Sequence, residues 1–336
     1  MPNQLQIYSS SDAGGPGVLF GAASEVLRVL DLILVNGYTA HPAAGWTKPF
    51  ANSGNIGCYK NASPANGGNG FGVVINDNGA NVTSTFKEAW ATGWETVLGV
   101  GSPVGTGTGQ FPTPAQLLTT GHVVIRKSAT ADGTTGRAWI CFADALTFYL
   151  FIASGDTAGA YFCLWFGDFF SLKGSTDTYR CMIQGEAIEN NGSTNTSQHT
   201  ADMIACNALS AASYLGCYAS RTYGGGGTSV QLYKQGASQF DSPTANLHAN
   251  VGTLQAPNGP DNAYYTPPIW ILEQPTLTLR GRLRGLYHSA HTLATWSDGQ
   301  VLTGAGDFAG KTLQAVSKGI NSGMWFIETS ATVETN

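Results

Sequence analysis

The sequence contains few charged residues. Asp, Glu, Lys and Arg make up 11% of its 336 residues, whereas about 25% is usual for soluble proteins. The net charge is −5 and only 16 residues are basic, so the chain lacks the basic surface with which proteins bind nucleic-acid phosphates. We therefore expect no nucleic-acid partner. Glycine is abundant at 44 residues. With so few charges, either the surface consists of Ser, Thr, Asn, Gln and Gly or partners bury much of it.

The six cysteines form no recognisable metal or redox motif. No CxxC pair and no short spacing of Cys and His of the zinc type occurs. Cys141 and Cys163 lie within apolar runs, where cysteine acts as a small hydrophobic residue. We predict six reduced thiols, as in a protein that folds in a cytoplasm. The opening residues, MPNQLQIYSSSDAGGPG, lack the basic head and apolar stretch of a signal peptide.

Long apolar runs and enzyme motifs are absent from the sequence as well. No run of about 18 apolar residues is present that would span a membrane as a helix, and there is no GxSxG, GxxxxGK[ST] or HExxH motif. His288 and His291 could form a metal site with Asp298, but without a second ligand pair we interpret them as surface histidines. We expect no enzyme activity, no cofactor, no metal and no membrane span.

Three carboxylates, Asp144, Asp156 and Asp168, recur every twelve residues. A glycosidase needs two carboxylates about 5 to 10 Å apart, so this spacing has to be considered as a catalytic pair. However, Asp144 and Asp156 fall at the ends of predicted strands, where Asp is typical of turns. We interpret them as turn residues.

The stretch 149–170, YLFIASGDTAGAYFCLWFGDFF, predicts two strands around a turn, and both faces of these strands are apolar. Phe151 lies on one face and Phe148 on the other, because side chains alternate along a strand. The hairpin is therefore either the middle of a sandwich or a subunit contact. We favour the sandwich, with Phe151 and Trp165 in the core and the C-terminal strands or a helix at 24–35 as the cover, because buried sheets have continuous apolar runs.

That helix is predicted by the periodicity of SEVLRVLDLILVNGY. Ser24 is the expected N-cap and Gly37 the left-handed stop, and the apolar spacing places Leu30 and Ile33 in the core. The helix is too apolar to be exposed to solvent on all sides. We expect it to cover a sheet.

The remaining segments predict mostly strands. The Thr and Trp content of residues 82–98 favours a strand over a helix, and GVGSPVGTGTGQFPTPAQLL predicts a glycine-rich loop with a short helix capped by Thr113. GHVVIRKS, GRAWICFADALTFYLFIAS, GAYFCLWFGDFF and TYRCMIQG predict an antiparallel meander. A long bent strand is expected over PPIWILEQPTLTLRGRLRGLYH, and a final hairpin over KTLQAVSKGINSGMWFIETS.

Together these patterns predict a mainly β fold, in which antiparallel β-sandwich-like sheets are accompanied by one N-terminal helix and a few short helices. A boundary near residue 190 would divide a β-rich part, 1–190, from a second β-rich part, 191–336. Whether these two parts pack as one unit stays open.

Arg280, Arg282 and Arg284 alternate along TLTLRGRLRGLYH and would share one face of a strand. Three adjacent guanidinium groups repel one another, so something anionic must face them. They could bind an anion or form salt bridges between subunits, or they could pair with Asp and Glu of a neighbouring strand. We favour pairing within the chain, because clustered Arg side chains usually have assigned partners.

An ordered set of motifs runs over nearly the whole chain: YSSSDAGGP, LDLILVNGY with HPAAGWTKPF, GTGTGQFPT, AWICFADALTFYLFIASGD, CLWFGDFFS, PPIWILE, LRGRLRGLYH and FIETS. In this order the motifs resemble a family of virion structural proteins of tailed bacteriophages. The resemblance implies a component of the particle, most directly of the tail or baseplate, and it supplies no catalytic residues.

Several expectations follow from that resemblance. The protein would be made in the cytoplasm of the bacterial host, reside in the virion, contact other virion proteins and form a homo-oligomer, a trimer or hexamer matching tail symmetry. A capsid-surface or collar protein is the near alternative. A host-recognition protein that binds or cleaves glycans is the other, since eight Trp and thirteen Tyr could supply stacking platforms for sugars.

Overall fold

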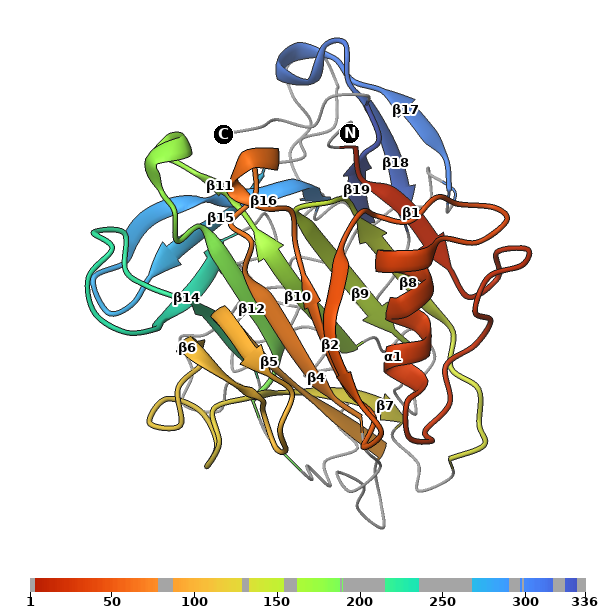
Figure 1. Ribbon diagram of the computed structural model, residues 1–336. Coiled ribbons are helices and arrows are strands. Elements are labelled where there is room, and N and C mark those ends of the chain that lie inside the picture. Colours follow the sequence, from red (N-terminus) through yellow and green to blue (C-terminus); the bar gives the residue numbers. More distant parts are fainter. Residues whose placement is uncertain are drawn as a thin grey trace, which may run out of the picture.

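In the residues that the structure describes, the fold is mainly β and antiparallel, with one α-helix and several short helices, as predicted. In the computed structural model the strands form three layers, so that a central sheet lies between two covering sheets. Figure 1 shows strands of the central sheet crossing the middle of the molecule, with helix α1 (Glu25–Leu30) beside them and the C-terminal strands, in blue, above. The structure describes residues 4–77, 87–128, 133–153, 162–187, 189, 215–235, 268–289, 297, 299–316 and 324–330.

The central sheet contains the predicted meander except for its first strand, since VVIRKS (Val123–Ser128) pairs instead with a strand of the N-terminal sheet. In the central sheet each strand pairs antiparallel with the next, and the strand β9 has the register Trp139↔Ile152 with β8 and Phe162↔Ile152 with β10. The first strand of the chain lies at one edge of this sheet. In spatial order the strands are β1 (Gln6–Ser9), β8 (Trp139–Ala143), β9 (Thr147–Ile152), β10 (Phe162–Asp168), β12 (Cys181–Glu186) and β13 (Leu215–Ala219).

The N-terminal sheet covers one face of the central sheet. The strand that was favoured for residues 82–98 is confirmed by β5, the longest strand of this sheet, although residues 82–86 lie outside the described part. One bridging pair, Glu186↔Val124, joins this sheet to the central one. Its strands are β2 (Thr47–Asn52), β3 (Ile56–Lys60), β4 (Gly72–Asn76), β5 (Lys87–Gly99), β6 (Thr106–Phe111) and β7 (Val123–Ser128).

The C-terminal sheet covers the opposite face. It includes the predicted final hairpin as the antiparallel pair β18 and β19, whose connecting residues 317–323 lie outside the described part. Its strands are β11 (Phe170–Ser171), β14 (Val230–Gln235), β15 (Pro268–Glu273), β16 (Thr278–Ser289), β17 (Val301–Thr303), β18 (Thr312–Val316) and β19 (Met324–Glu328). The short 3₁₀ helices are η2 (Pro64–Asn66), η3 (Gly174–Thr176) and η4 (Gly306–Phe308).

The two apolar faces of the hairpin β9–β10 belong to two different cores. Phe148, Leu150 and Ile152 pack in the core between the central and N-terminal sheets. Phe151 and Trp165 pack in the core between the central and C-terminal sheets, and both are fully buried. Both covers are therefore parts of the same chain.

Helix α1 (Glu25–Leu30) continues directly into a π-helical segment, η1 (Asp31–Asn36). Leu30 and Ile33 are completely buried in the core that the N-terminal sheet covers. The predicted cap is wrong, because Ser24 is in the left-handed region and its side chain makes no capping hydrogen bond. The carboxylate of Asp77 replaces it by accepting a hydrogen bond of 2.8 Å from the Val26 N–H.

The glycine-rich segment that was predicted as a loop is in part the strand β6, which pairs with β5. Glycine at position 107 lets the two backbones come close together, since a Cβ there would lie 2.1 Å from the Thr96 carbonyl oxygen. Gly109 has a left-handed φ of +66°, which favours glycine. Thr113, the predicted helix cap, begins a turn and not a helix, and its hydroxyl hydrogen bonds with the Gln116 side chain.

The segment predicted as one long bent strand is a hairpin. β15 and β16 pair antiparallel and are joined by a turn at residues 274–277. Of the two prolines that were expected to interrupt the strand, Pro268 begins β15, where a missing N–H is tolerated, and Pro267 lies outside the described residues. The chain reverses further on, where Leu277 has a φ of +52°.

Strand pairing continues across residue 190. β12 pairs with β13 over five residues, from Met182↔Ala219 to Glu186↔Leu215. The core beneath the C-terminal sheet also combines residues from both sides of that position. In the described residues the chain on either side of 190 thus contributes to one central sheet.

Candidate functional site

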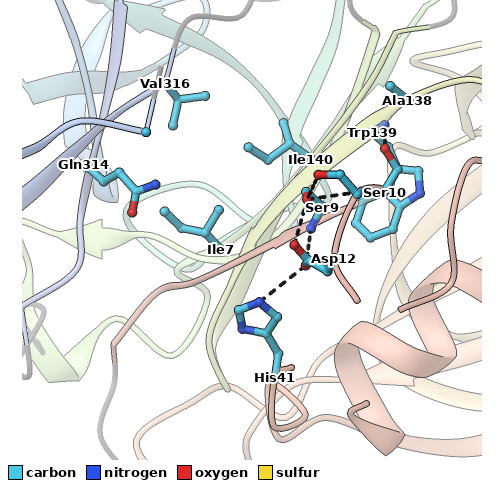
Figure 2. A pocket seen from close by; sticks show the side chains of 12 residues that line it. Ile7, Ser9, Ser10, Asp12, His41, Ala138, Trp139, Ile140, Gln314 and Val316 are labelled. Carbon is cyan, nitrogen blue, oxygen red and sulfur yellow. Dashed lines mark hydrogen bonds and ion pairs between the residues drawn. The ribbon is translucent and has the colours of Figure 1, made fainter. Parts of the chain in front are cut away.

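A pocket of about 490 Å³ lies where β1 and the turn after it meet β8 and β18. Its volume falls within the range of about 300 to 1,000 Å³ that is usual for small-molecule sites. Figure 2 shows side chains from these distant parts of the sequence around one cavity. The pocket is therefore a candidate for a small-molecule binding site.

One side of the pocket is a polar turn organised by Asp12. Its Oδ2 accepts hydrogen bonds from the Ser9 N–H, 2.7 Å away, and from the Tyr38 hydroxyl, 2.6 Å away, while its Oδ1 accepts one from the Ser9 hydroxyl at 2.8 Å. The Nε2 of His41 lies 3.4 Å from Oδ2. The carboxylate thereby fixes a serine, a tyrosine and a histidine from three separate segments.

Aromatic packing holds His41 in this position. Its ring lies 5.3 Å from that of Tyr8 and 5.5 Å from that of Tyr38, measured between ring centres. Tyr8 is fully buried and its hydroxyl donates to the Pro42 carbonyl oxygen. The loop that carries His41 is thus anchored to β1 on both sides of the histidine.

The middle of the pocket is aliphatic. Ile7 and Ile140 lie on the paired strands β1 and β8, and Val316 faces them from β18 (Figure 2). Beyond them Gln314 extends its side-chain amide into the same cavity. Hydrogen-bonding groups thus stand on two sides of an apolar strip, with Gln314 on one side and the Asp12 turn on the other.

Ser, Asp and His are the residue types of a hydrolase triad, but their arrangement in space differs here. In such a triad histidine lies between the nucleophile and the carboxylate. In this pocket the Ser9 hydroxyl donates to Asp12, and the carboxylate lies between Ser9 and His41. The Ser9 hydroxyl is thus directed at the carboxylate and not at His41, so these three residues do not form the serine–histidine contact of such a triad.

The three arginines do not share one face of β16. A register shift between Ile271 and Leu272 inserts an extra residue into β16. Arg280 consequently points inward, whereas Arg282 stands opposite Trp270 on the outer face.

Arg280 and Arg284 are buried and have acidic partners within the chain. Arg280 contacts Glu273 at 2.6 Å and Asp177 at 3.3 Å, and Arg284 contacts Asp144 at 3.0 Å. These two residues are therefore not available as an interface or anion contact. The guanidinium of Arg282 lies 4.8 Å from the ring centre of Phe170.

Asp144 and Asp168 are both buried. Asp144 accepts hydrogen bonds from the backbone N–H groups of Leu146 and Thr147, as expected of a turn residue. Burial raises the pKa of Asp168 to about 7, against the lowering effect of nearby Arg180. Asp156 lies outside the described residues, and neither Asp144 nor Asp168 lines the pocket.

The proposed histidine pair is not tested by the structure. His288 lies in β16, but its side chain, His291 and Asp298 fall outside the described part of the chain. Within the described ranges no group of three His, Cys, Asp or Glu side chains is placed to hold a metal ion. In the same ranges no helix has the length and apolar character needed to cross a membrane.

The described cysteines, Cys58, Cys141, Cys163, Cys181 and Cys217, are buried and none forms a disulfide. Burial raises the thiol pKa of Cys58 to about 12. Such thiols are unreactive near neutral pH, because the thiolate is the nucleophile.

Sequence reasoning missed the pocket. A local signal existed, since Ser9 and Asp12 are three residues apart and Asp side chains at that spacing hydrogen bond to nearby backbone. Nothing in the sequence indicates that His41, Ile140 and Gln314 lie beside them, because the approach of these residues depends on sheet pairing. No protein-family model matches the chain, and no curated protein matches it.

Proposed function

We propose that the protein is a structural component of a bacteriophage particle, in the tail or baseplate, and that it acts by assembling with neighbouring subunits. Two observations support this proposal. The ordered motifs resemble virion structural proteins, and the outer face of the C-terminal sheet carries apolar and aromatic side chains. The second observation carries the argument, because it gives assembly a specific surface.

The outer face of β11, β14, β15 and β16 is built by strand register. Tyr233 pairs with Leu272, and Trp270 pairs with Arg282, which in turn pairs with Phe170. Paired residues point to the same side of a sheet. Each of these five side chains is partly exposed, in contrast to their buried neighbours along the strands.

Leucines extend this face. Leu279 pairs with Leu272 and is 42% exposed, and Leu172, next to the backbone of Arg280, is 48% exposed. Leu277, in the turn of the same hairpin, is 51% exposed and has a left-handed φ of +52°. An exposed leucine in a strained backbone position is unfavourable in an isolated subunit. Such local violations are typical of functional sites, and contiguous apolar patches mark interaction surfaces.

The occupant that we propose for this face is a second copy of the chain. A homo-oligomer, a trimer or hexamer in keeping with tail symmetry, would bury the leucines and the partly exposed Trp270. Other virion proteins would contact the surface of the protein that the homo-oligomer leaves exposed.

The test compares Leu172→Ser/Leu279→Ser with Leu98→Ser. Leu98 is a matched control, because it is 66% exposed and lies on β5, a strand of the N-terminal sheet. We expect light scattering to show an oligomer for the unaltered protein and for Leu98→Ser, and a dissociated, folded subunit for the double variant. A wild-type monomer, or equal association of all three proteins, would contradict assembly through this face.

The position in the particle needs a separate experiment. Antibody labelling of purified phage particles, viewed by electron microscopy, should place the protein at the tail or baseplate. Labelling of the capsid surface or collar would favour the near alternative, and particles without the protein would overturn the proposal as a whole.

A further inference from the structure

The pocket of Figure 2 has the chemistry of a site for a neutral sugar. A pyranose ring presents C–H groups on its two faces and hydroxyl groups around its edge. The pocket offers the matching arrangement, since Ile7, Ile140 and Val316 form an apolar strip and polar side chains stand on either side of it. Ligand sites generally combine apolar lining with a few placed polar groups in this way.

The polar groups are held in place before any ligand arrives. Asp12 is fixed by hydrogen bonds from Ser9 and Tyr38, and Ser10 is fixed because its Oγ accepts a hydrogen bond of 3.3 Å from the Trp139 N–H. Preorganised groups lose little conformational entropy on binding. Together with the Ser10 hydroxyl, the Asp12 carboxylate gives a sugar both a donor and an acceptor.

Gln314 supplies the opposite side. Among the described residues its side-chain amide forms no hydrogen bond, so both its carbonyl oxygen and its NH₂ group are open to a ligand. An amide can accept and donate at once, which suits vicinal hydroxyl groups.

The charge of the lining selects the class of sugar. Asp12 is the one acidic side chain among the lining residues of the described chain, and no Lys or Arg is among them. A phosphate, sulfate or uronic acid would meet the Asp12 carboxylate without a Lys or Arg in the lining to compensate its charge, so a neutral ligand is favoured.

We propose that this pocket binds a neutral saccharide unit through the aliphatic strip of Ile7, Ile140 and Val316 and through hydrogen bonds to Gln314 and the Asp12 turn. The inference does not depend on the assembly surface, which lies on other strands. It differs from the sequence-based alternative of aromatic platforms, because Trp139 is buried and its Nε1 donates to the Gly17 carbonyl oxygen.

Saturation-transfer NMR with the full chain tests this inference. The probes are the methyl glycosides of glucose, galactose, mannose and N-acetylglucosamine, with methyl glucuronoside as the anionic comparison. We expect binding of at least one neutral glycoside and about tenfold weaker binding of the glucuronoside.

Two variants locate the binding. Ala138→Trp places a large ring at an exposed lining position, and Gln314→Ala removes the amide. Each should weaken binding about tenfold or more, while Ala65→Trp and Gln231→Ala, the same changes outside the pocket, should leave it unchanged. Circular dichroism checks that each variant folds. If Ala138→Trp fails to fold, Gln314→Ala still decides the test.

Three results would overturn the inference. They are the absence of binding to all four neutral glycosides, equal binding to every folded variant, and binding of the glucuronoside as tight as that of the neutral sugars.

Discussion

At the scale of single residues, Asp168 makes stability depend on pH. Burial raises its pKa to about 7, above the value of about 3.9 of an unfolded chain. Between these values the folded state binds the extra proton, so this residue's contribution to stability is present below pH ~4 and lost as the pH rises through 7. In the unaltered protein this residue lowers the free energy of unfolding by up to about 1.4 kcal/mol for each unit by which the pH rises. We expect Asp168→Asn to remove this decline.

Urea unfolding of both proteins from pH 4 to 8 measures this effect. The difference between the two curves is needed, because other groups titrate in the same range. Burial also raises the pKa of Asp77, to about 6, which adds a decline of the same sign. Burial lowers the pKa of His122 to about 4, so stability from that residue increases as the pH rises from ~4 to ~6.5. Parallel curves for Asp168→Asn and the unaltered protein would show that the interpretation is wrong.

At the scale of elements, helix α1 depends on an ion pair between Asp77, which follows β4, and Lys127, near the end of β7. Asp77 Oδ2 caps the helix at Val26, and its Oδ1 lies 2.6 Å from the Lys127 ammonium, with both charged side chains fully buried. Lys127→Met would leave a buried carboxylate without its cation. We expect a loss of about 3 to 5 kcal/mol in the free energy of unfolding, measured in urea at pH 7.

The double variant Asp77→Asn/Lys127→Met is the control for this pair. Asparagine keeps the cap but carries no charge, so the double variant should recover part of the stability. A double variant that is no more stable than Lys127→Met would argue against an unpaired charge as the cause.

At the scale of the whole molecule, Phe151 connects the central sheet to its C-terminal cover. Its ring lies 5.6 Å from that of Trp165 and 5.7 Å from that of Trp325, between ring centres. Phe151→Ser removes these contacts and leaves a cavity, so we expect a loss of about 3 to 5 kcal/mol and failure to fold, not merely failure to assemble. Val301→Ser, at a position that is 62% exposed, should change stability by less than about 0.5 kcal/mol. Circular dichroism of the soluble fractions decides, and a folded Phe151→Ser monomer would contradict this role.

Much of this architecture was predictable because burial on two faces leaves a local mark. The continuous apolar run of β9 and β10 indicated two dry faces, and the periodicity around Leu30 indicated a covering helix. Partners distant in sequence left no such mark. Asp77 replaces Ser24 as the cap from 51 residues away, and β6 is a strand despite its glycines because β5 approaches it closely. The pocket was missed for the same reason, since Gln314 and Asp12 meet only when the sheets are assembled.

The doubly covered hairpin also determines where this protein can change. In most antiparallel sheets every second residue of a strand faces water and tolerates substitution. In β9 the adjacent residues Leu150 and Phe151 belong to different cores. Neither face of the strand is therefore free to accept polar substitutions. Sequence divergence among copies of this fold would therefore accumulate on the outer faces of the two covering sheets, one of which carries the proposed assembly surface.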